Sequence, residues 1–163
     1  MSGRIDIAPG QAGETSVADR LEAASESCAR QGGRLTELRR LVLELVLEAD
    51  RPVGAYDLLE QLRQRHAGAA PPTVYRALDF LVAYGLVHKL ALQNAFVSCS
   101  GGGHHTHPAQ LLVCRSCGSV VELEDADIRA TLVRAAAAYG FVVGDGALEV
   151  PGLCAACAAG SRD

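Results

Sequence analysis

Two cysteine pairs of identical spacing constrain this chain more than any other feature of its sequence. Cys114 and Cys117 form the first pair, and Cys154 and Cys157 form the second after 36 intervening residues. A Cys-x-x-Cys turn presents two thiolates to one metal ion, and two such turns complete the tetrahedral four-thiolate shell of a structural zinc site. The sequence therefore predicts a closed, structural zinc site in the last part of the chain.

Disulfides and a thiol redox pair are the alternatives for the same cysteines. The sequence shows no secretory signal, so we do not expect an oxidising compartment. A redox motif needs only one pair, beside a βαβ pattern that this sequence does not show. No apolar run approaches the ~18 residues of a membrane span, and we expect a cytoplasmic protein.

The length of 163 residues suits one domain of ordinary size or two small ones, and a glycine run divides the chain. Before this run, helical periodicity and turn residues predict a winged helix-turn-helix, in which four helices precede a hairpin. The helices are expected over residues 17–31, from Thr36 to the break at Pro52, over 55–66 and over 73–84, and the strands over 86–92 and 95–98.

We therefore expect an α+β fold in two domains. Residues 1–15 lack periodicity and are predicted to be a disordered tail. A winged-helix DNA-binding domain is expected over 16–99, a glycine-rich linker over 100–103 and a second, smaller domain over 104–163.

The second domain is expected to contain both short strands and a helix. Strands are predicted over 111–114 and 119–123, on either side of the first cysteine pair. Asp125 is expected to cap a helix that reaches Tyr139. Residues 141–150 are predicted to be a strand pair or one bent strand, after which the second cysteine pair closes the chain.

Charge is distributed unevenly along a chain whose net charge is −4. Residues 28–97 carry nine basic and seven acidic side chains, whereas both flanking segments are negative. The positive segment coincides with the predicted winged helix, which permits DNA binding but is weak support by itself.

Arg76 is the first candidate for a DNA contact, because a guanidinium can bond a guanine bidentately or clamp a phosphate. A single helix arginine is more often solvated, but this helix follows a turn and precedes a hairpin, which favours DNA. Thr73 and Tyr75 lie near the N-terminal end of the same helix. Either can touch the DNA backbone, or instead cap or pack.

A second group of possible metal ligands extends from the predicted hairpin into the second domain. Imidazole, thiolate and carboxylate together suit zinc, whereas magnesium and calcium prefer oxygen ligands. Ligands from two domains would let a metal hold those domains in one orientation. A solvated loop is the alternative for His104 and His105, and a buried core thiol for Cys99. The group comprises His88, Cys99, His104, His105, His107 and Glu122.

Several stretches of the sequence resemble the ferric uptake regulator superfamily, and most of all its zinc uptake regulator branch. The resemblance covers about residues 17–158, and its most specific stretch is Pro-Pro-Thr-Val-Tyr-Arg-Ala-Leu-Asp-Phe-Leu over 71–81. It also includes Ala-Tyr-Asp-Leu-Leu over 55–59, Val-His-Lys over 87–89 and Gly-Leu-Cys-Ala-Ala-Cys over 152–157. The resemblance implies a homodimeric repressor of zinc-uptake genes that binds operator DNA when zinc-loaded and dimerises through its second domain.

The resemblance also implies roles for single residues. The paired cysteines match structural zinc ligands, a second zinc per subunit would be regulatory, and Tyr56 and Arg76 match operator contacts. Family members often carry a histidine on the strand before the last cysteine pair, where this chain has Asp145, with Pro151 further on, and this difference argues against an iron-type third site of histidines and carboxylates. The implied regulatory ligands are His88, Cys99, His107 and Glu122, with His104 and His105 as auxiliary or competing ligands.

Other functions make different demands on the sequence. A zinc enzyme needs an open coordination position and a placed acid or base. Four protein ligands leave neither, and no His-Glu-x-x-His motif occurs, so we expect no enzyme. An iron-responsive regulator would more typically sense with histidines and carboxylates than with a thiolate. A zinc chaperone or storage protein would have no use for the helix over 73–84.

Glu60 and Arg63 lie three residues apart on the third predicted helix, away from its apolar positions. One interpretation is an ordinary solvated pair within the helix. The other is that two dimers on one operator exchange these charges, Glu60 of one meeting Arg63 of its neighbour across a two-fold axis.

Overall fold

The computed structural model describes residues 4–5, 16–101, 109–123 and 125–160, and these contain a winged helix followed by a second α+β unit. The N-terminal elements are α1 (Val17–Arg30), α2 (Glu37–Glu48), β2 (Val53–Gly54), α3 (Ala55–Arg65), α4 (Pro71–Ala83), β3 (Val87–Leu90) and β4 (Ala95–Ser98). The C-terminal elements are β5 (Gln110–Cys114), β6 (Val120–Leu123), α5 (Ala126–Ala137), β7 (Leu148–Gly152) and α6 (Ala155–Gly160). The N-terminal strand β1 (Arg4–Ile5) adds to the sheet of this half.

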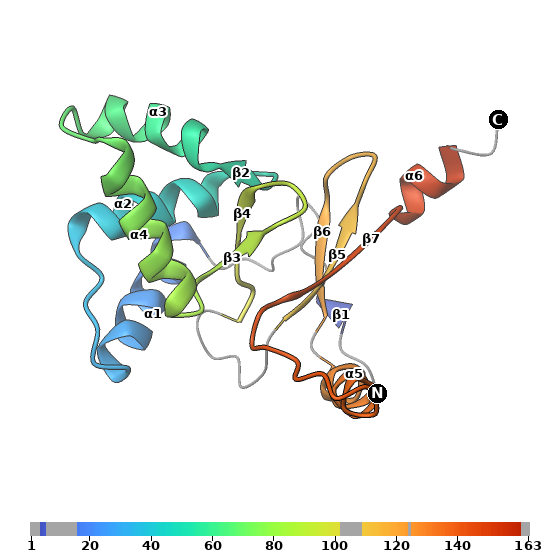
Figure 1. Ribbon diagram of the computed structural model, residues 1–163. Helices are drawn as coiled ribbons and strands as arrows, with labels where there is room; N and C mark the ends of the chain where they lie inside the picture. Colours follow the sequence, from blue (N-terminus) through green and yellow to red (C-terminus); the bar gives the residue numbers. More distant parts are fainter. Residues whose placement is uncertain (1–3, 6–15, 102–108, 124, 161–163) are drawn as a thin grey trace.

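The helices α1 to α4 gather on one side of the molecule and the strands β5, β6 and β7 stand on the other (Figure 1). The β3–β4 hairpin, the wing, lies between them, so the expected α+β fold is confirmed. The strand β1 lies in the segment that was predicted to be a tail and pairs with the edge of β6. In the described ranges no helix has the length and apolar character to cross a membrane.

Local signals in the sequence account for the helix boundaries of the winged helix. Ser16 begins α1 with a capping box, in which its hydroxyl accepts the Asp19 N–H while the Asp19 carboxylate accepts the Ser16 N–H. The helix α4 begins at Pro71, before the predicted start, because a first-turn proline gives up no helical hydrogen bond. Thr36 precedes α2 as predicted, but its side chain makes no capping bond.

The apolar faces of the helices meet in one core. Leu58, Leu62 and Leu78 are fully buried, because spacings of three and four residues place apolar side chains on one face of a helix. The opposite faces of α3 and α4 remain open, with Tyr56 73% and Tyr75 50% exposed. Packing therefore fixes the helices and leaves one surface of α3 and α4 available to a partner.

A parallel strand pair determines the layout of the C-terminal half. The strands β5 and β6 form an antiparallel hairpin, and β7 adds to the other side of β5 in parallel, giving the sheet order β1-β6-β5-β7. Parallel strands need a long connection, which here runs through β6 and α5. Asp125 caps α5 as predicted, because its carboxylate accepts N–H bonds from Asp127 and Ile128.

The prediction for residues 141–150 was wrong in part. Residues 141–147 form no helix or strand, and only the end of the stretch enters β7. Phe141 and Val142 are 66% and 88% exposed, so the apolar run that suggested a strand lies on the surface instead of in the sheet. The helix α5 ends at Ala137, earlier than expected, and the short helix α6 was not predicted.

The wing packs against the C-terminal sheet through a shared apolar cluster. Leu90 and Val97 of the wing are buried together with Leu111, Val113 and Val120 of β5 and β6. Because this cluster excludes water from the contact, it holds the wing and the C-terminal sheet side by side.

A carboxylate beside this cluster adds a polar contact between the two halves. Glu149 of β7 accepts N–H bonds from the turn of the wing, at 2.5 Å from Ala91 N and 3.1 Å from Leu92 N. The apolar cluster and this contact together bring β3 alongside β6, and the residues that face each other there form the second site described below.

Candidate metal centres

The four paired cysteines come together at one end of the C-terminal sheet. Cys114 ends β5 and Cys117 lies in the turn to β6, whereas Cys154 and Cys157 follow β7. Because β7 runs parallel to β5, with Gly152 opposite Cys114, the second pair emerges beside the first. The four Sγ atoms all lie within 4.8 Å of one another. This four-cysteine cluster fits a structural zinc site.

Hydrogen bonds favour thiolates at the first cysteine pair. The backbone N–H groups of Cys117 and Cys154 lower the pKa of Cys114 to about 5, and the Cys154 N–H lies 3.3 Å from the Cys114 Sγ. The Ser119 side chain, 3.2 Å from the Cys117 Sγ, lowers the pKa of Cys117. Both sulfurs are therefore prepared to act as metal ligands, because the thiolate is the ligating form.

The second pair shows what a bound cation would contribute to the cluster. The Ser116 side chain favours a thiolate at Cys157, but the neighbouring Cys154 and Cys117 outweigh it and raise the pKa of Cys157 to about 11. The raised pKa keeps the Cys157 thiol neutral at neutral pH unless a positive charge lies nearby to favour its thiolate. A zinc ion supplies that charge and accepts four sulfurs in a tetrahedral shell.

We expect Cys117→Ser to give an unfolded or monomeric protein, because a domain of about sixty residues depends strongly on its metal for stability. Zinc content measured by elemental analysis and molar mass measured by light scattering check this expectation. Cys28→Ala is the matched control, since Cys28 is buried in the helical core and belongs to neither cluster. A stable Cys117→Ser dimer with unchanged zinc content would show that the assignment is wrong.

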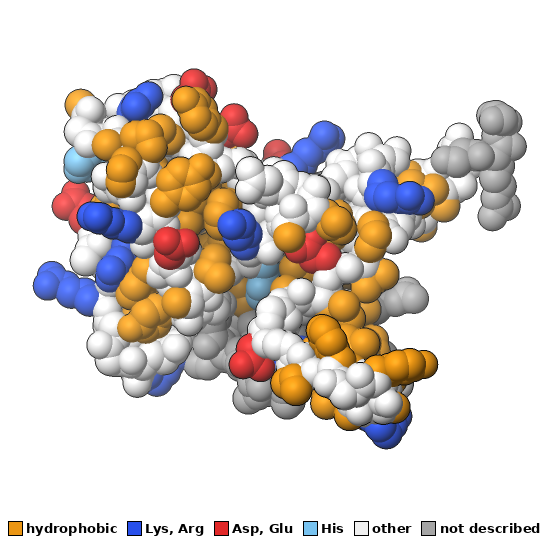
Figure 2. Space-filling view, in the orientation of Figure 1, with side chains coloured by type: hydrophobic (Ala, Val, Ile, Leu, Met, Phe, Trp, Pro, Cys, Tyr) orange, Lys and Arg blue, Asp and Glu red, His pale blue; other side chains and the backbone are white. Residues whose placement is uncertain are grey.

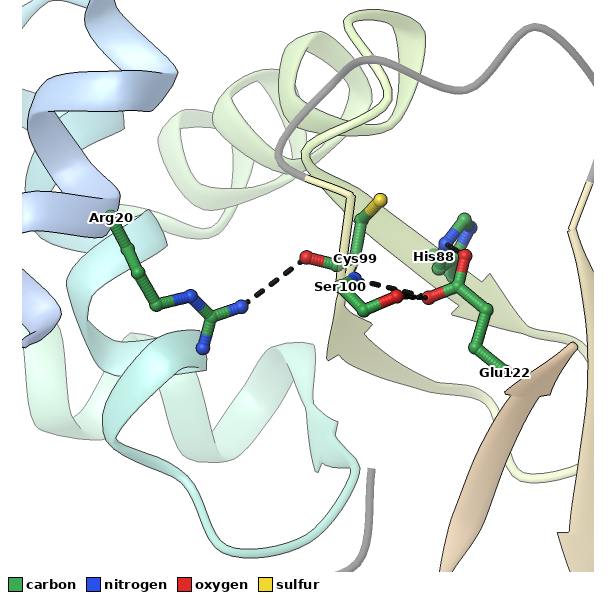
Figure 3. A network of polar contacts seen from close by, with 5 residues as sticks. All are labelled: Arg20, His88, Cys99, Ser100 and Glu122. Carbon is green, nitrogen blue, oxygen red and sulfur yellow. Dashed lines mark hydrogen bonds and ion pairs between the residues drawn. The ribbon is translucent and has the colours of Figure 1, made fainter. Parts of the chain in front are cut away.

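A second cluster of possible ligands lies where the wing meets the C-terminal sheet (Figure 3). His88 from β3, Cys99 directly after β4 and Glu122 from β6 each offer a ligand atom, and these atoms lie within 4.8 Å of one another. Glu122 is fully buried and Cys99 is 2% exposed. The two halves of the chain therefore supply one cluster, as the sequence predicted for these three residues.

Each oxygen of the Glu122 carboxylate has its own partner (Figure 3). Oε1 lies 2.9 Å from His88 Nε2, whereas Oε2 accepts the Ser100 N–H at 3.0 Å and the Ser100 hydroxyl at 2.8 Å. The Arg20 guanidinium of α1 donates to the Cys99 carbonyl at 3.2 Å. Neither Ser100 nor Arg20 was identified from the sequence as part of this cluster. The one sequence signal for either is that Ser100 directly follows Cys99, a candidate ligand.

These contacts determine the charges in the cluster without a bound metal. Burial disfavours the charged form of His88, but bonds with Cys99 and Glu122 outweigh it and raise the pKa of His88 to about 9. Burial also disfavours the Glu122 carboxylate, but His88 and Ser100 outweigh it and lower the pKa of Glu122 to about 2. At neutral pH the cluster therefore pairs an imidazolium with a carboxylate.

The donor set fits zinc better than the alkaline earth ions. One nitrogen, one sulfur and one oxygen ligand all occur in zinc sites, whereas calcium and magnesium select oxygen. His104, His105 and His107, the remaining predicted ligands, lie outside the described residues, and their roles stay predictions. Asp145 is exposed, lies 3.4 Å from Arg129 and belongs to neither cluster in the described chain.

Zinc binding at the second cluster is expected to release a proton from His88, because a protonated nitrogen cannot ligate a metal. The pKa of His88 is raised to about 9, so protons compete with zinc below that pH, and zinc affinity should rise as pH rises from neutral toward it. Proton release on zinc addition is measured with an indicator in weak buffer, using protein that already holds zinc in the four-cysteine cluster. His66→Ala, at the exposed end of α3, is the control. Zinc binding that is independent of pH across this range would contradict the expectation.

The candidate DNA contacts lie on the open surface of α3 and α4. Tyr75 and Arg76 are exposed in the first turns of α4, and Tyr56 is exposed at the start of α3. Thr73 is half-buried and does not cap the helix, because Ala70 occupies the N-cap position. Three of the four predicted side chains are thus accessible to a ligand.

The structure gives Arg63 a partner other than Glu60. Both side chains are exposed on α3, but Arg63 Nε donates to the Ala69 carbonyl at 3.3 Å, in the turn between α3 and α4. Among the described residues, no ion pair joins Glu60 to Arg63. Both side chains are therefore solvated, as the first interpretation has it, but they are not paired with each other, and the contact between dimers stays a prediction.

Comparison with known proteins relates this chain to one family. A model of the ferric uptake regulator family matches residues 30–151. The zinc uptake regulation protein of Escherichia coli K12 is 40% identical over 144 residues, which cover 88% of this chain and 84% of that protein.

Two solved structures are similar over most of their length. The crystal structure of holo XcZur matches with a TM-score of 0.79 and 46% identity, over 88% of this chain and 99% of that one. A zinc uptake regulator complexed with zinc and DNA matches with a TM-score of 0.82 and 38% identity, over 92% of this chain and 100% of that one.

Proposed function

The chain belongs to the ferric uptake regulator family, and we propose that it is a zinc-responsive transcriptional repressor of zinc-uptake genes. One observation carries the proposal: the second cluster takes His88 and Cys99 from the winged helix and Glu122 from the C-terminal sheet. A metal bound by all three joins the two halves of the chain, so its occupancy controls the orientation of the winged helix.

Thermodynamic linkage then connects zinc to DNA. Zinc favours the orientation in which its ligands converge, and operator DNA selects the same orientation in both winged helices of a dimer. Each ligand then raises the affinity for the other by the same factor. Couplings of this kind are typically about 1–3 kcal/mol, or roughly 5–150-fold in affinity. The zinc-loaded protein represses by occupying its operator.

Each subunit holds two zinc ions in this proposal. The four-cysteine cluster binds the structural zinc, which stays in place while the regulatory zinc exchanges. His88, Cys99 and Glu122 bind the regulatory zinc, with His107 as the fourth ligand. His104 and His105 precede His107 in the chain and serve as auxiliary ligands.

The homodimer forms through the apolar surface of the C-terminal half, which gathers over α5 in the lower right of Figure 2. Ile128, Leu132 and Val133 are 39%, 37% and 43% exposed, and α5 buries no residue within a single chain. Together with Phe141 and Val142 they form an apolar patch of the kind that marks an interface. A second copy of the chain covers this patch.

The surface of α3 and α4 is proposed to bind operator DNA. Arg76 reads a base or clamps a phosphate from α4, while Tyr56, Thr73 and Tyr75 contact the backbone near it. The solved relative that is described as complexed with zinc and DNA supports this use of the winged helix.

Other functions receive less support from the two clusters. The protein is proposed not to be an enzyme, because four cysteines complete the coordination of one zinc ion and His107 is proposed to complete that of the other, which leaves no open position for a substrate. The Cys99 thiol at the regulatory site favours zinc over iron. A storage protein would not need the open surface of α3 and α4. A regulator of this kind acts in the cytoplasm, where its genes and zinc pool are.

Two single substitutions test the function, because they should separate zinc sensing from DNA contact. Zinc titrations of operator binding are the measurement. His88→Ala should lower the zinc content by one ion per subunit and abolish most zinc-dependent operator affinity, while the dimer remains folded. Arg76→Ala should keep both zinc ions and the dimer, yet lose ~1–3 kcal/mol of operator affinity if it reads a base.

The outcomes distinguish the parts of the proposal. An equal loss on operator and random DNA would identify Arg76 as a phosphate contact. Wild-type protein whose operator affinity does not change with zinc would refute the regulatory function, and unaltered zinc response in His88→Ala would remove His88 from the ligand set.

Two dimers on one operator are proposed to contact each other through Glu60 and Arg63. Glu60→Arg should lower the cooperativity of binding to a full operator while sparing the affinity for a half-operator, because only the second dimer needs the contact. Adding Arg63→Glu should restore cooperativity. Since Arg63 also bonds the Ala69 carbonyl, the half-operator affinity of the double variant must first match that of the wild type. Equal cooperativity in wild type and Glu60→Arg would exclude the contact.

A further inference from the structure

We infer that Ser100 is a positioning residue for the regulatory metal site, because it holds one oxygen of Glu122 and thereby leaves the other oxygen to face the metal. The inference rests on the proposed function, since it concerns the site that senses zinc. It adds a residue that no resemblance or sequence pattern assigned.

The carboxylate geometry carries the inference. Ser100 places two donors on the same oxygen, Oε2 of Glu122, with its N–H at 3.0 Å and its hydroxyl at 2.8 Å. Oε1 instead points toward His88 Nε2, at 2.9 Å, among the ligand atoms of the cluster (Figure 3). Two donors on one oxygen prevent the carboxylate from rotating, so Glu122 offers a metal Oε1 alone.

Burial makes this positioning effective. Glu122 is fully buried, so water does not compete with Ser100 for Oε2. Hydrogen bonds to an ionised carboxylate are roughly twice as strong as bonds between neutral groups. Partners that orient a metal ligand are worth a large share of metal affinity, and their loss typically weakens binding 10–100-fold.

The position of Ser100 in the chain also links the two halves. It directly follows Cys99, so two adjacent residues supply a thiol ligand and orient the carboxylate ligand of the other half. The Arg20 guanidinium holds the Cys99 carbonyl from α1 at 3.2 Å. The Cys99–Ser100 segment is therefore tied to α1 on one side and to β6 on the other, before any metal binds (Figure 3).

The test is zinc affinity at the second cluster, measured by competition with a chelator in dimeric protein that keeps its four-cysteine zinc. Ser100→Ala removes the hydroxyl but keeps the N–H, and should weaken zinc binding ~10–100-fold without changing the number of zinc ions per subunit. Ser100→Thr keeps a hydroxyl and should restore most of the affinity. Ser98→Ala is the matched control, because Ser98 makes no hydrogen bond to Glu122 among the described contacts.

A double-mutant cycle separates positioning from a purely structural role. If Ser100 acts through Glu122, Ser100→Ala should have little further effect on zinc affinity in a Glu122→Gln background. Cobalt in place of the regulatory zinc gives a second readout. Its d–d absorption bands should change in Ser100→Ala, whereas the charge-transfer band from the Cys99 thiolate should remain.

The outcomes for the inference and for the proposed function differ. Wild-type protein that binds a second zinc, together with Ser100→Ala that matches it in affinity and cobalt spectrum, would overturn the inference and leave the proposed function standing. If Ser100→Ala weakens zinc binding equally in the wild-type and Glu122→Gln backgrounds, the inference is likewise overturned. Wild-type protein that takes up no second zinc would refute the proposed function, and the inference with it.

Discussion

Glu122 places a carboxylate with no solvent exposure at the boundary between the two halves of the chain. Burying an unpaired charge costs several kcal/mol, so this residue requires donors at fixed positions. His88 and Ser100 provide them from the wing side, and in doing so they hold β6 against the end of the hairpin. The same contacts therefore balance the charge of one buried side chain and join the wing to β6. In the proposed function, a metal that replaces the proton of His88 would change both.

The four-cysteine cluster depends on a different constraint, the parallel pairing of β5 and β7. Sequence spacing brings the cysteines together only within each pair, and the register that sets Gly152 opposite Cys114 brings the pairs together. The Arg115 N–H reinforces this register by donating to the Gly152 carbonyl at 2.9 Å. A zinc ion bound there would hold the ends of β5 and β7 together. It would thereby also fix the position of β7, whose Glu149 bonds to the turn of the wing.

The two surfaces of the chain suit different partners. The helices of the N-terminal half bury their apolar stripes in one core and expose Tyr56, Tyr75 and Arg76, which can bond to a polar and charged ligand. In contrast, α5 exposes Ile128 and Val133 and has no fully buried residue in a single chain, which suits an apolar partner. In the proposed function, the cluster of His88, Cys99 and Glu122 lies between these surfaces, so that one bound ion would influence how the two winged helices of a dimer meet DNA.

The four helices and the wing of the N-terminal half, the cap at Asp125 and the two cysteine pairs could be predicted from the sequence, because they depend on spacings of a few residues. His88, Cys99 and Glu122 could be named only as candidate ligands by residue type, since their convergence across 34 residues depends on the packing of the wing against β6. Helical periodicity predicts which residues are buried, and paired cysteines predict thiolate ligands whatever the rest of the fold. Only the tertiary structure decided that residues 141–147 form no strand, since an apolar run becomes a strand only if a neighbouring strand pairs with it. It alone showed that Ser100 meets Glu122, 22 residues away, and that Arg20 meets Cys99 across 79 residues. Such contacts leave no periodic signal, because they arise from the packing of separate elements and from the need to pair a buried charge.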